Sequence, residues 1–303
     1  MALSADRTGQ LTSRYRRREH ALPSMPGTRP ASDLERSASK PAKSDLMSNT
    51  GICRLCQTPN AVLRASHIVP EFFYKRIYTR THKFTAISKD PDERVSVDQK
   101  GYREFLLCQA CETKLSKWEG KLSLLTNEVT SENYVTHTAM KVSNVTCITG
   151  VDYPAIKMGV LSIFWRMGIA CHPLFSIYKL GPYSEVLRKL LDQSVVPAEA
   201  EFPVLLSRGL LDGAFHAGIL FPVGQGRYDN NLIIQSVVLN GIVFDCFMTN
   251  TRRIPEEVQK FAINSGGRVL MPNRPYEQLG LDVGEFSARM KKVDVKSFYA
   301  RHT

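Results

Sequence analysis

The chain has 303 residues, of which 43% are hydrophobic and 23% charged, a composition typical of a globular protein with a sizeable core. Seven cysteines are too few for a disulfide scaffold of this length, so free thiols in a reducing cytoplasm are expected. The N-terminus lacks an apolar signal peptide, and Lys157 and Arg166 interrupt the longest apolar stretch, 153–171. These features predict a cytoplasmic protein with no membrane partner, and the length favours two domains.

The net charge of +11 favours a polyanionic partner, with nucleic acid ahead of an anionic membrane. Nine basic and five acidic residues in segment 1–46 supply +4 of it, which leaves +7 for the rest of the chain. Many proteins with no nucleic-acid role carry that much charge. The charge alone therefore decides neither the partner nor the oligomeric state.

Residues 1–49 are rich in Ser, Arg, Pro and Ala and have no hydrophobic period, which predicts a disordered basic tail. The run Arg14-Tyr15-Arg16-Arg17-Arg18 is typical of a solvated tail, although it also suits contact with phosphate. Met47 offers a third interpretation, because translation starting there would leave residues 1–46 out of the protein.

Two Cys-x-x-Cys pairs are the most informative motif: Cys53 with Cys56, and Cys108 with Cys111. A two-residue gap lets both sulfurs of a pair face one centre about 2.3 Å away, and two pairs complete a tetrahedron. One pair alone would also suit a redox motif, and unrelated buried thiols are the plain alternative. Two matched spacings in a chain poor in cysteine favour one structural Zn²⁺ held by all four. The other three cysteines have no such spacing: Cys147, Cys171 and Cys246.

Residues 50–130 form the predicted zinc module. The elements expected between the two cysteine pairs are a strand over 61–65, a helix over 71–78 that opens on Pro70, and a loop or irregular β-excursion over 79–101. A longer helix is expected from about Glu112. Its apolar residues recur at three- and four-residue spacing: Leu115, Trp118, Leu122 and Leu125.

Residues 150–303 are predicted to form a separate α+β domain, which makes the whole chain α+β. The expected elements are helices over 155–170 and 183–191, a helix start at Pro255, and strands over 202–206, 217–221, 232–239, 242–248 and 268–271. The clearest is a hairpin, because Asn240-Gly241 stands between two β-branched runs and is typical of a type I′ turn.

Three motifs of the zinc module follow one another in a recognisable order. They are Cys53-x-x-Cys56, Ser66-His67-Ile68-Val69-Pro70 and Leu107-Cys108-x-x-Cys111-Glu112. This order resembles the zinc-stapled branch of the HNH endonuclease superfamily. The resemblance covers less than a quarter of the chain. Residues 50–300 as a whole also resemble a bacterial group of HNH-endonuclease-like proteins whose role is poorly defined.

The resemblance implies a ββα-metal module, in which a β-hairpin and a helix surround a catalytic Mg²⁺ or Mn²⁺ apart from the structural zinc. It implies that His67 is the general base, a neutral imidazole that takes a proton from water so that hydroxide attacks the phosphodiester. The metal would stabilise the charge on the leaving oxygen. From the residues alone, a structural ligand or a satisfied buried histidine are further interpretations of His67.

The sequence departs from the HNH pattern where the catalytic metal would be held. Ser66 replaces the expected Asp or His ligand, Glu112 replaces an Asn or His, and Arg103 stands where a central Asn is expected. Glu112 still offers oxygen ligands for Mg²⁺ or Mn²⁺, and Glu119, two turns on, is a weaker candidate. Closing both cysteine pairs on one zinc should bring His67 near Glu112. Either the site is rebuilt around Glu112 or the module has lost its chemistry.

Two functions fit these observations. The first is a metal-dependent endonuclease that hydrolyses the phosphodiester bonds of DNA, of the kind used in bacterial defence or by mobile elements. The alternative is a catalytically inactive zinc-stabilised module that binds nucleic acid or a protein, with residues 150–300 as the recognition domain. No Gly-rich phosphate loop, Ser-His-Asp order or dinucleotide fingerprint indicates another class of enzyme.

Overall fold

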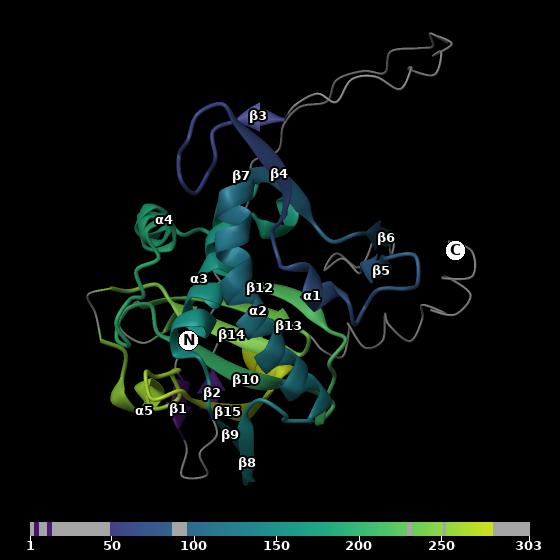
Figure 1. Cartoon of the computed structure of the whole chain (residues 1–303). Coiled ribbons are helices and arrows are strands. Elements are labelled where there is room, and N and C mark those ends of the chain that lie inside the picture. Colours follow the sequence, from purple (N-terminus) through teal and green to yellow (C-terminus); the bar gives the residue numbers. More distant parts are fainter. Residues whose placement is uncertain are drawn as a thin grey trace, which may run out of the picture.

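The computed structural model describes residues 3–5, 11–13, 49–86, 96–228, 232–250 and 253–280. Within the predicted disordered tail, two short strands pair antiparallel, β1 (Leu3–Ala5) and β2 (Leu11–Ser13). The remainder of that tail up to residue 48 lies outside the described residues, as do residues 281–303. The predicted α+β class is confirmed, with one large sheet and few helices (Figure 1).

An eight-stranded sheet forms the centre of the fold. Its strands are β12 (Leu220–Tyr228), β13 (Leu232–Leu239), β14 (Ile242–Phe247), β10 (Val204–Leu211), β15 (Arg268–Pro275), β9 (Val145–Thr149) and β8 (Thr138–Val142), in that spatial order. The eighth strand, β11 (Ala214–Phe215), pairs with β10. β10 and β15 run parallel, and the other described pairs in this sheet are antiparallel.

The predicted Asn-Gly hairpin is confirmed as β13 and β14. Leu239 pairs with Ile242, which leaves Asn240 and Gly241 as a two-residue loop. Both loop residues have positive φ, 53° and 76°, as a type I′ turn requires. A side chain at Gly241 would meet the carbonyl oxygen of His216 at 2.4 Å, so the turn needs glycine for space as well as for conformation.

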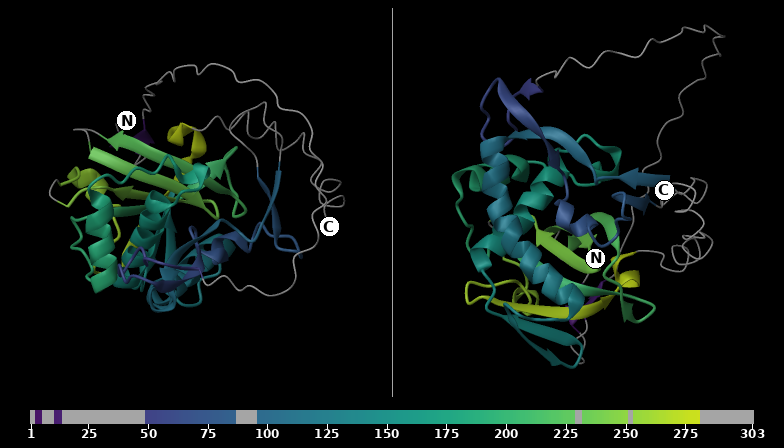
Figure 2. Two further views of the ribbon diagram at one scale, coloured as in Figure 1. Left: turned by 90° about the horizontal axis from the view of Figure 1, so that it is seen from above. Right: turned by 45° about the vertical axis from the view of Figure 1, so that its right-hand side comes forward.

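Two long helices, α2 (Gln109–Ser131) and α3 (Tyr153–Ile169), pack against each other over one face of the large sheet (Figures 1 and 2). α3 is buried over nearly its whole length, as a helix with apolar residues on all sides must be. One continuous core joins α2, α3 and the sheet. The predicted zinc module and C-terminal domain thus share a hydrophobic core, since α2 buries its apolar face against α3.

Short elements cover the opposite face of the sheet. α5 (Glu256–Gln259) places Val258 against Leu205 and Phe247, and the 3₁₀-helix η3 (Tyr276–Leu279) packs on Val238 and Val243. α4 (Tyr183–Gln193) and the 3₁₀-helix η1 (Pro173–Phe175) follow α3. Among the described residues, no helix combines the length and apolar character needed to cross a membrane.

A small three-stranded sheet projects beyond the end of α2 that lies farthest from β8 (Figure 1). Its strands are β3 (Thr50–Gly51), β4 (Ala61–His67) and β7 (Arg103–Cys108), in that order. Between β4 and β7 the chain forms α1 (Glu71–Tyr74) and the two-stranded sheet β5 (Lys83–Ala86) and β6 (Ser96–Gln99). β4, β7 and α2 therefore form the strand–strand–helix unit that carries the candidate site.

Several elements differ in length from the sequence prediction. The helix predicted over 71–78 ends at Tyr74, where single turns follow as Ile77 and Tyr78 donate to the Tyr74 carbonyl. α2 begins at Gln109, three residues earlier than predicted. This early start places Cys111 in the first turn of the helix, with Cys108 as the N-cap.

Candidate metal centre

The first cysteine pair lies in a tight turn between β3 and β4. The amide of Gln57 donates to the Cys53 carbonyl at 2.9 Å, and Cys53 N donates to the Thr58 carbonyl at 3.0 Å. Gln57 adopts a positive φ of 59°, which closes the turn within a few residues. Arg54 N donates to the Leu106 carbonyl at 2.9 Å and so ties this turn to β7.

The second pair bridges a strand and a helix. Cys108 is the last residue of β7 and the N-cap of α2, and Cys111 is buried in the first turn of α2. The Cys108 amide donates to the sulfur of Cys53 at 3.3 Å, so the two pairs are joined by a main-chain hydrogen bond as well as by proximity. This N–H···S contact stabilises negative charge on the sulfur.

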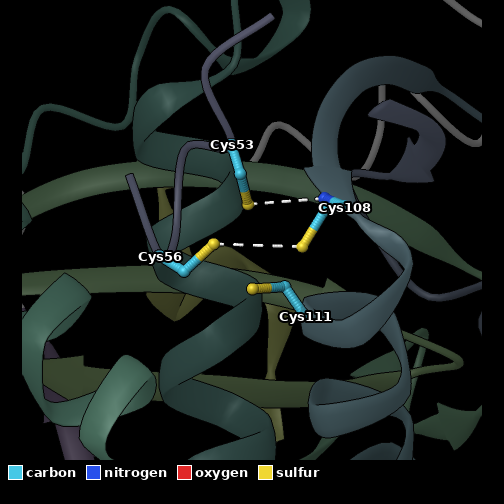
Figure 3. A group of neighbouring side chains, drawn as sticks. All are labelled: Cys53, Cys56, Cys108 and Cys111. Atoms are coloured by element: carbon cyan, nitrogen blue, oxygen red, sulfur yellow. Dashed lines mark hydrogen bonds between the residues drawn. The ribbon is translucent and has the colours of Figure 1, made fainter. Parts of the chain in front are cut away.

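The four side chains point into one volume (Figure 3). All four sulfur atoms lie within 4.8 Å of one another, and those of Cys56 and Cys108 are 3.9 Å apart. Four sulfurs placed tetrahedrally about 2.3 Å from a zinc ion would be about 3.8 Å apart. None of the four is in a disulfide. The predicted convergence of Cys53, Cys56, Cys108 and Cys111 is confirmed, and the donor set fits a tetrahedral metal ion such as zinc.

The protonation of the thiols depends on burial and on local hydrogen bonds. Burial raises the pKa of the Cys53 and Cys111 thiols. Burial would also raise the pKa of Cys56, but hydrogen bonds from Thr58 outweigh it and lower that pKa to about 6. A bound cation reverses the cost of burying thiolates, because it supplies the missing positive charge.

Helix α4 also holds the first cysteine turn in place. Arg188 donates to the Leu55 carbonyl at 2.6 Å and is itself held by Glu185 at 2.7 and 2.8 Å. Lys114 of α2 lies 3.4 Å from the Asp192 carboxylate of α4. The centre is therefore fixed by three elements besides its own turn: β7, α2 and α4.

His67 lies at the far end of β4 from the cysteines. It pairs across the hairpin with Arg103, and the Arg103 Nε donates to His67 Nε2 at 2.9 Å. Arg103 also contacts the Lys100 carbonyl at 3.1 Å and the Glu71 carboxylate at 3.5 Å. Burial, and next the positive charge of Arg103, lower the pKa of His67. His67 is therefore neutral at pH 7, with Nε2 accepting a hydrogen bond.

Ser66 faces the core. It is 1% exposed, and its hydroxyl accepts from the Leu107 amide at 3.2 Å. This bond lies beside a β-bulge, where β7 carries one residue more than β4 between two neighbouring pairs. The hydroxyl thus accepts from a main-chain amide that has no partner in the irregular strand ladder. Serine at this position therefore has a structural explanation.

The two candidate carboxylates on α2 differ in their surroundings. Glu119 forms a close ion pair with Arg166 of α3, and Arg166 also donates to the His67 carbonyl at 2.8 Å. Glu112 has a buried carboxylate oxygen, Oε1, without a hydrogen-bond partner. An orphaned acceptor of this kind is costly unless a cation or water reaches it.

The structure records no direct contact between His67 and Glu112 in the part of the chain that it describes. The strand register pairs Leu63 with Cys108 and His67 with Arg103. His67 thus lies four residues beyond Leu63, about 13 Å along the strand. The predicted proximity of His67 and Glu112 stays a prediction.

Two arginines at the site have roles that the sequence did not predict. Arg103 was noted only as a departure from the HNH pattern, and Arg166 only as an interruption in an apolar stretch. The sequence did contain a signal for Arg166, because a charged residue inside an otherwise buried helix requires a buried partner. Glu119 is that partner, 47 positions away in the sequence.

Comparisons with family models, with curated proteins and with solved structures found no match to this chain. Any statement about its activity therefore depends on its own residues and their arrangement.

Proposed function

We propose that Cys53, Cys56, Cys108 and Cys111 bind one structural Zn²⁺. The proposal is supported by four free thiols within 4.8 Å of one another. Soft thiolates select zinc over Mg²⁺ or Ca²⁺, and a site with four protein ligands leaves no open position for a substrate. Zinc would then fix the turn after β3 to the start of α2.

We further propose that the zinc-stapled unit is an HNH-like endonuclease that hydrolyses phosphodiester bonds of DNA. The main observation behind the nuclease proposal is the pairing of His67 with Arg103. The pair lies at one end of the β4–β7 hairpin, and the cysteine cluster lies at the other end. A neutral imidazole beside a guanidinium is suited to proton transfer next to a phosphate. The net charge of +11 adds a general attraction for polyanions.

Arg103 would act as a switch on His67. In the free protein, Arg103 occupies the Nε2 lone pair that a general base needs. A phosphate accepts charge-assisted hydrogen bonds from arginine more strongly than a neutral imidazole does. Substrate binding would thus draw Arg103 to the phosphate and free His67 Nε2 to take a proton from water.

Glu112 would hold a catalytic Mg²⁺ or Mn²⁺, and its orphaned Oε1 supports a cation there. Such an ion would neutralise charge at the phosphate when bound. His67 needs no metal to stay neutral, since burial and Arg103 already lower its pKa.

A second candidate is a zinc-stabilised module that binds DNA or a protein without cleaving it. One observation favours it: Ser66 stands where the HNH pattern expects a metal ligand, and its hydroxyl is bound to the Leu107 amide. The four cysteines are also the one cluster of three or more metal-binding side chains among the described residues.

Plasmid DNA and a single-stranded circular DNA, each incubated with Mg²⁺, Mn²⁺ or Ni²⁺, distinguish the two candidates. The nuclease proposal expects nicking or linearisation by the wild type and at least a roughly 100-fold slower reaction for His67→Ala, since general bases contribute about that much. His216→Ala, a histidine outside the hairpin, is the control and should cut like the wild type. No cleavage with any of the metals, or equal cleavage by His67→Ala, would leave the binding module as the function.

A further inference from the structure

Phe105 is an exposed aromatic ring on the same face of the hairpin as the candidate base. Ala65 pairs with Phe105 and His67 with Arg103. Paired residues, and residues two apart on a strand, direct their side chains to one face of a sheet. His67, Arg103 and Phe105 therefore share a face, while Ser66 lies on the other, buried one.

A β-bulge directs Phe105 to this face. Leu106 is the extra residue of β7, and both Leu106 and Leu107 are buried. In a regular strand Phe105 would follow Leu107 to the buried side. The bulge shifts the alternation by one residue, so Phe105 is 51% exposed beside Arg103. Bulges next to active sites commonly redirect a side chain in this way.

The charges around Phe105 favour an anionic strand. Arg103 lies two residues away on β7, about 7 Å along the strand. Among the described residues its one carboxylate partner is Glu71, 3.5 Å away, a distance at which a surface ion pair contributes little. Glu104 is turned away, because its carboxylate accepts from the amides of Cys171 and His172.

We propose that Phe105 stacks on an unpaired DNA base while Arg103 holds the neighbouring phosphate. The ligand class is single-stranded DNA, since a base paired within a duplex does not present its flat face to a protein ring. This inference rests on the proposed function, because it gives the substrate class of the His67 face. Phe105 binds the strand, and His67 and Arg103 act on the phosphate beside it.

Fluorescence anisotropy tests the inference. A labelled 20-mer is titrated with the protein, once as a single strand and once as the matching duplex, without a divalent metal. Phe105→Leu keeps an apolar side chain but removes the ring, and should weaken single-strand binding by about 5- to 150-fold, the range for loss of one stacked base. Phe105→Trp should restore it. Duplex binding should change by less than about twofold in both variants, because phosphate contacts alone support it.

Val62→Ala is the matched control. Val62 is 57% exposed on β4, lies three residues before Ala65 and pairs with Thr50 of β3. This variant should bind both DNAs like the wild type, and thermal unfolding should show all variants folded. Unchanged single-strand binding by Phe105→Leu, or an equal loss on duplex, would overturn the inference.

The outcome is separable from that of the nuclease proposal. If the wild type cleaves DNA through His67 while Phe105→Leu binds single strands normally, the stacking inference fails alone. If Phe105 is needed for single-strand binding but nothing is cleaved, the nuclease fails and the stacking site belongs to a binding module.

Discussion

Arg103 binds His67 in the free protein and helps to lower its pKa. Its Nε donates to His67 Nε2, and its guanidinium is the second cause, after burial, of the lowered pKa of His67. Removing the guanidinium would leave the burial but take away the positive charge. The interaction is therefore open to direct measurement without any assay of activity.

Arg103→Ala should raise the pKa of His67 towards the ordinary value of histidine, because a cation beside an imidazole disfavours its protonated form. NMR titration of the His67 ring protons gives that pKa directly. Arg64→Ala, an exposed arginine three residues before His67, is the control and should move it less. An unchanged pKa in Arg103→Ala would show that Arg103 does not control His67.

At the scale of elements, one carboxylate joins α2 to β8. Glu128 is buried near the end of α2 and accepts from the amides of Val135, Thr136 and His137. The ring of His137 lies 2.6 Å from the same carboxylate. Desolvation would raise the pKa of Glu128, but the hydrogen bonds from Thr136 and His137 outweigh it and lower that pKa to about 2.

The lowered pKa of Glu128 predicts a pH dependence of stability. The carboxylate titrates near pH 4.3 in the unfolded chain and near 2 in the fold, so it stabilises the fold fully above the first value. That contribution is lost as the pH falls towards 2. Glu128→Gln should therefore lower the free energy of unfolding most at neutral pH, and the gap from wild type should close in acid.

Urea unfolding between pH 7 and pH 3 measures the gap between Glu128→Gln and the wild type. Glu256→Gln, an exposed carboxylate of α5, is the control and should follow the wild-type curve. If the difference in the free energy of unfolding between Glu128→Gln and the wild type stays constant with pH, Glu128 stabilises the fold by packing and not by its charge.

For the whole molecule, local patterns in the sequence predicted the parts whose determinants are local. The cysteine spacing predicted the cluster, and Asn240-Gly241 predicted the hairpin, because each depends on a few neighbouring residues. The shared core and the Arg166–Glu119 pair were not predicted, since they join residues far apart in the chain. The bulge that redirects Phe105 likewise depends on the pairing of β4 with β7, which no local pattern of β7 shows.

The shared core also changes what the zinc is expected to stabilise. The cysteine centre is attached to α2 through Cys111 and to α4 through the bond from Arg188 to Leu55. α2 packs on α3 within the same core as the large sheet. Loss of zinc should therefore loosen β3, β4 and β7 first, while the sheet and α3 keep their own packing.

The central claim is that four cysteines hold one zinc ion. It is tested most directly by X-ray absorption spectroscopy at the zinc edge of the purified protein, together with measurement of its metal content. The account predicts one zinc per chain, surrounded by four sulfurs at about 2.3 Å. Cys56→Ser combined with Cys111→Ser should lose the metal, whereas Cys246→Ser, a buried thiol outside the cluster, should retain it. Well under one zinc per chain, or a first shell with nitrogen or oxygen in place of sulfur, would contradict the account.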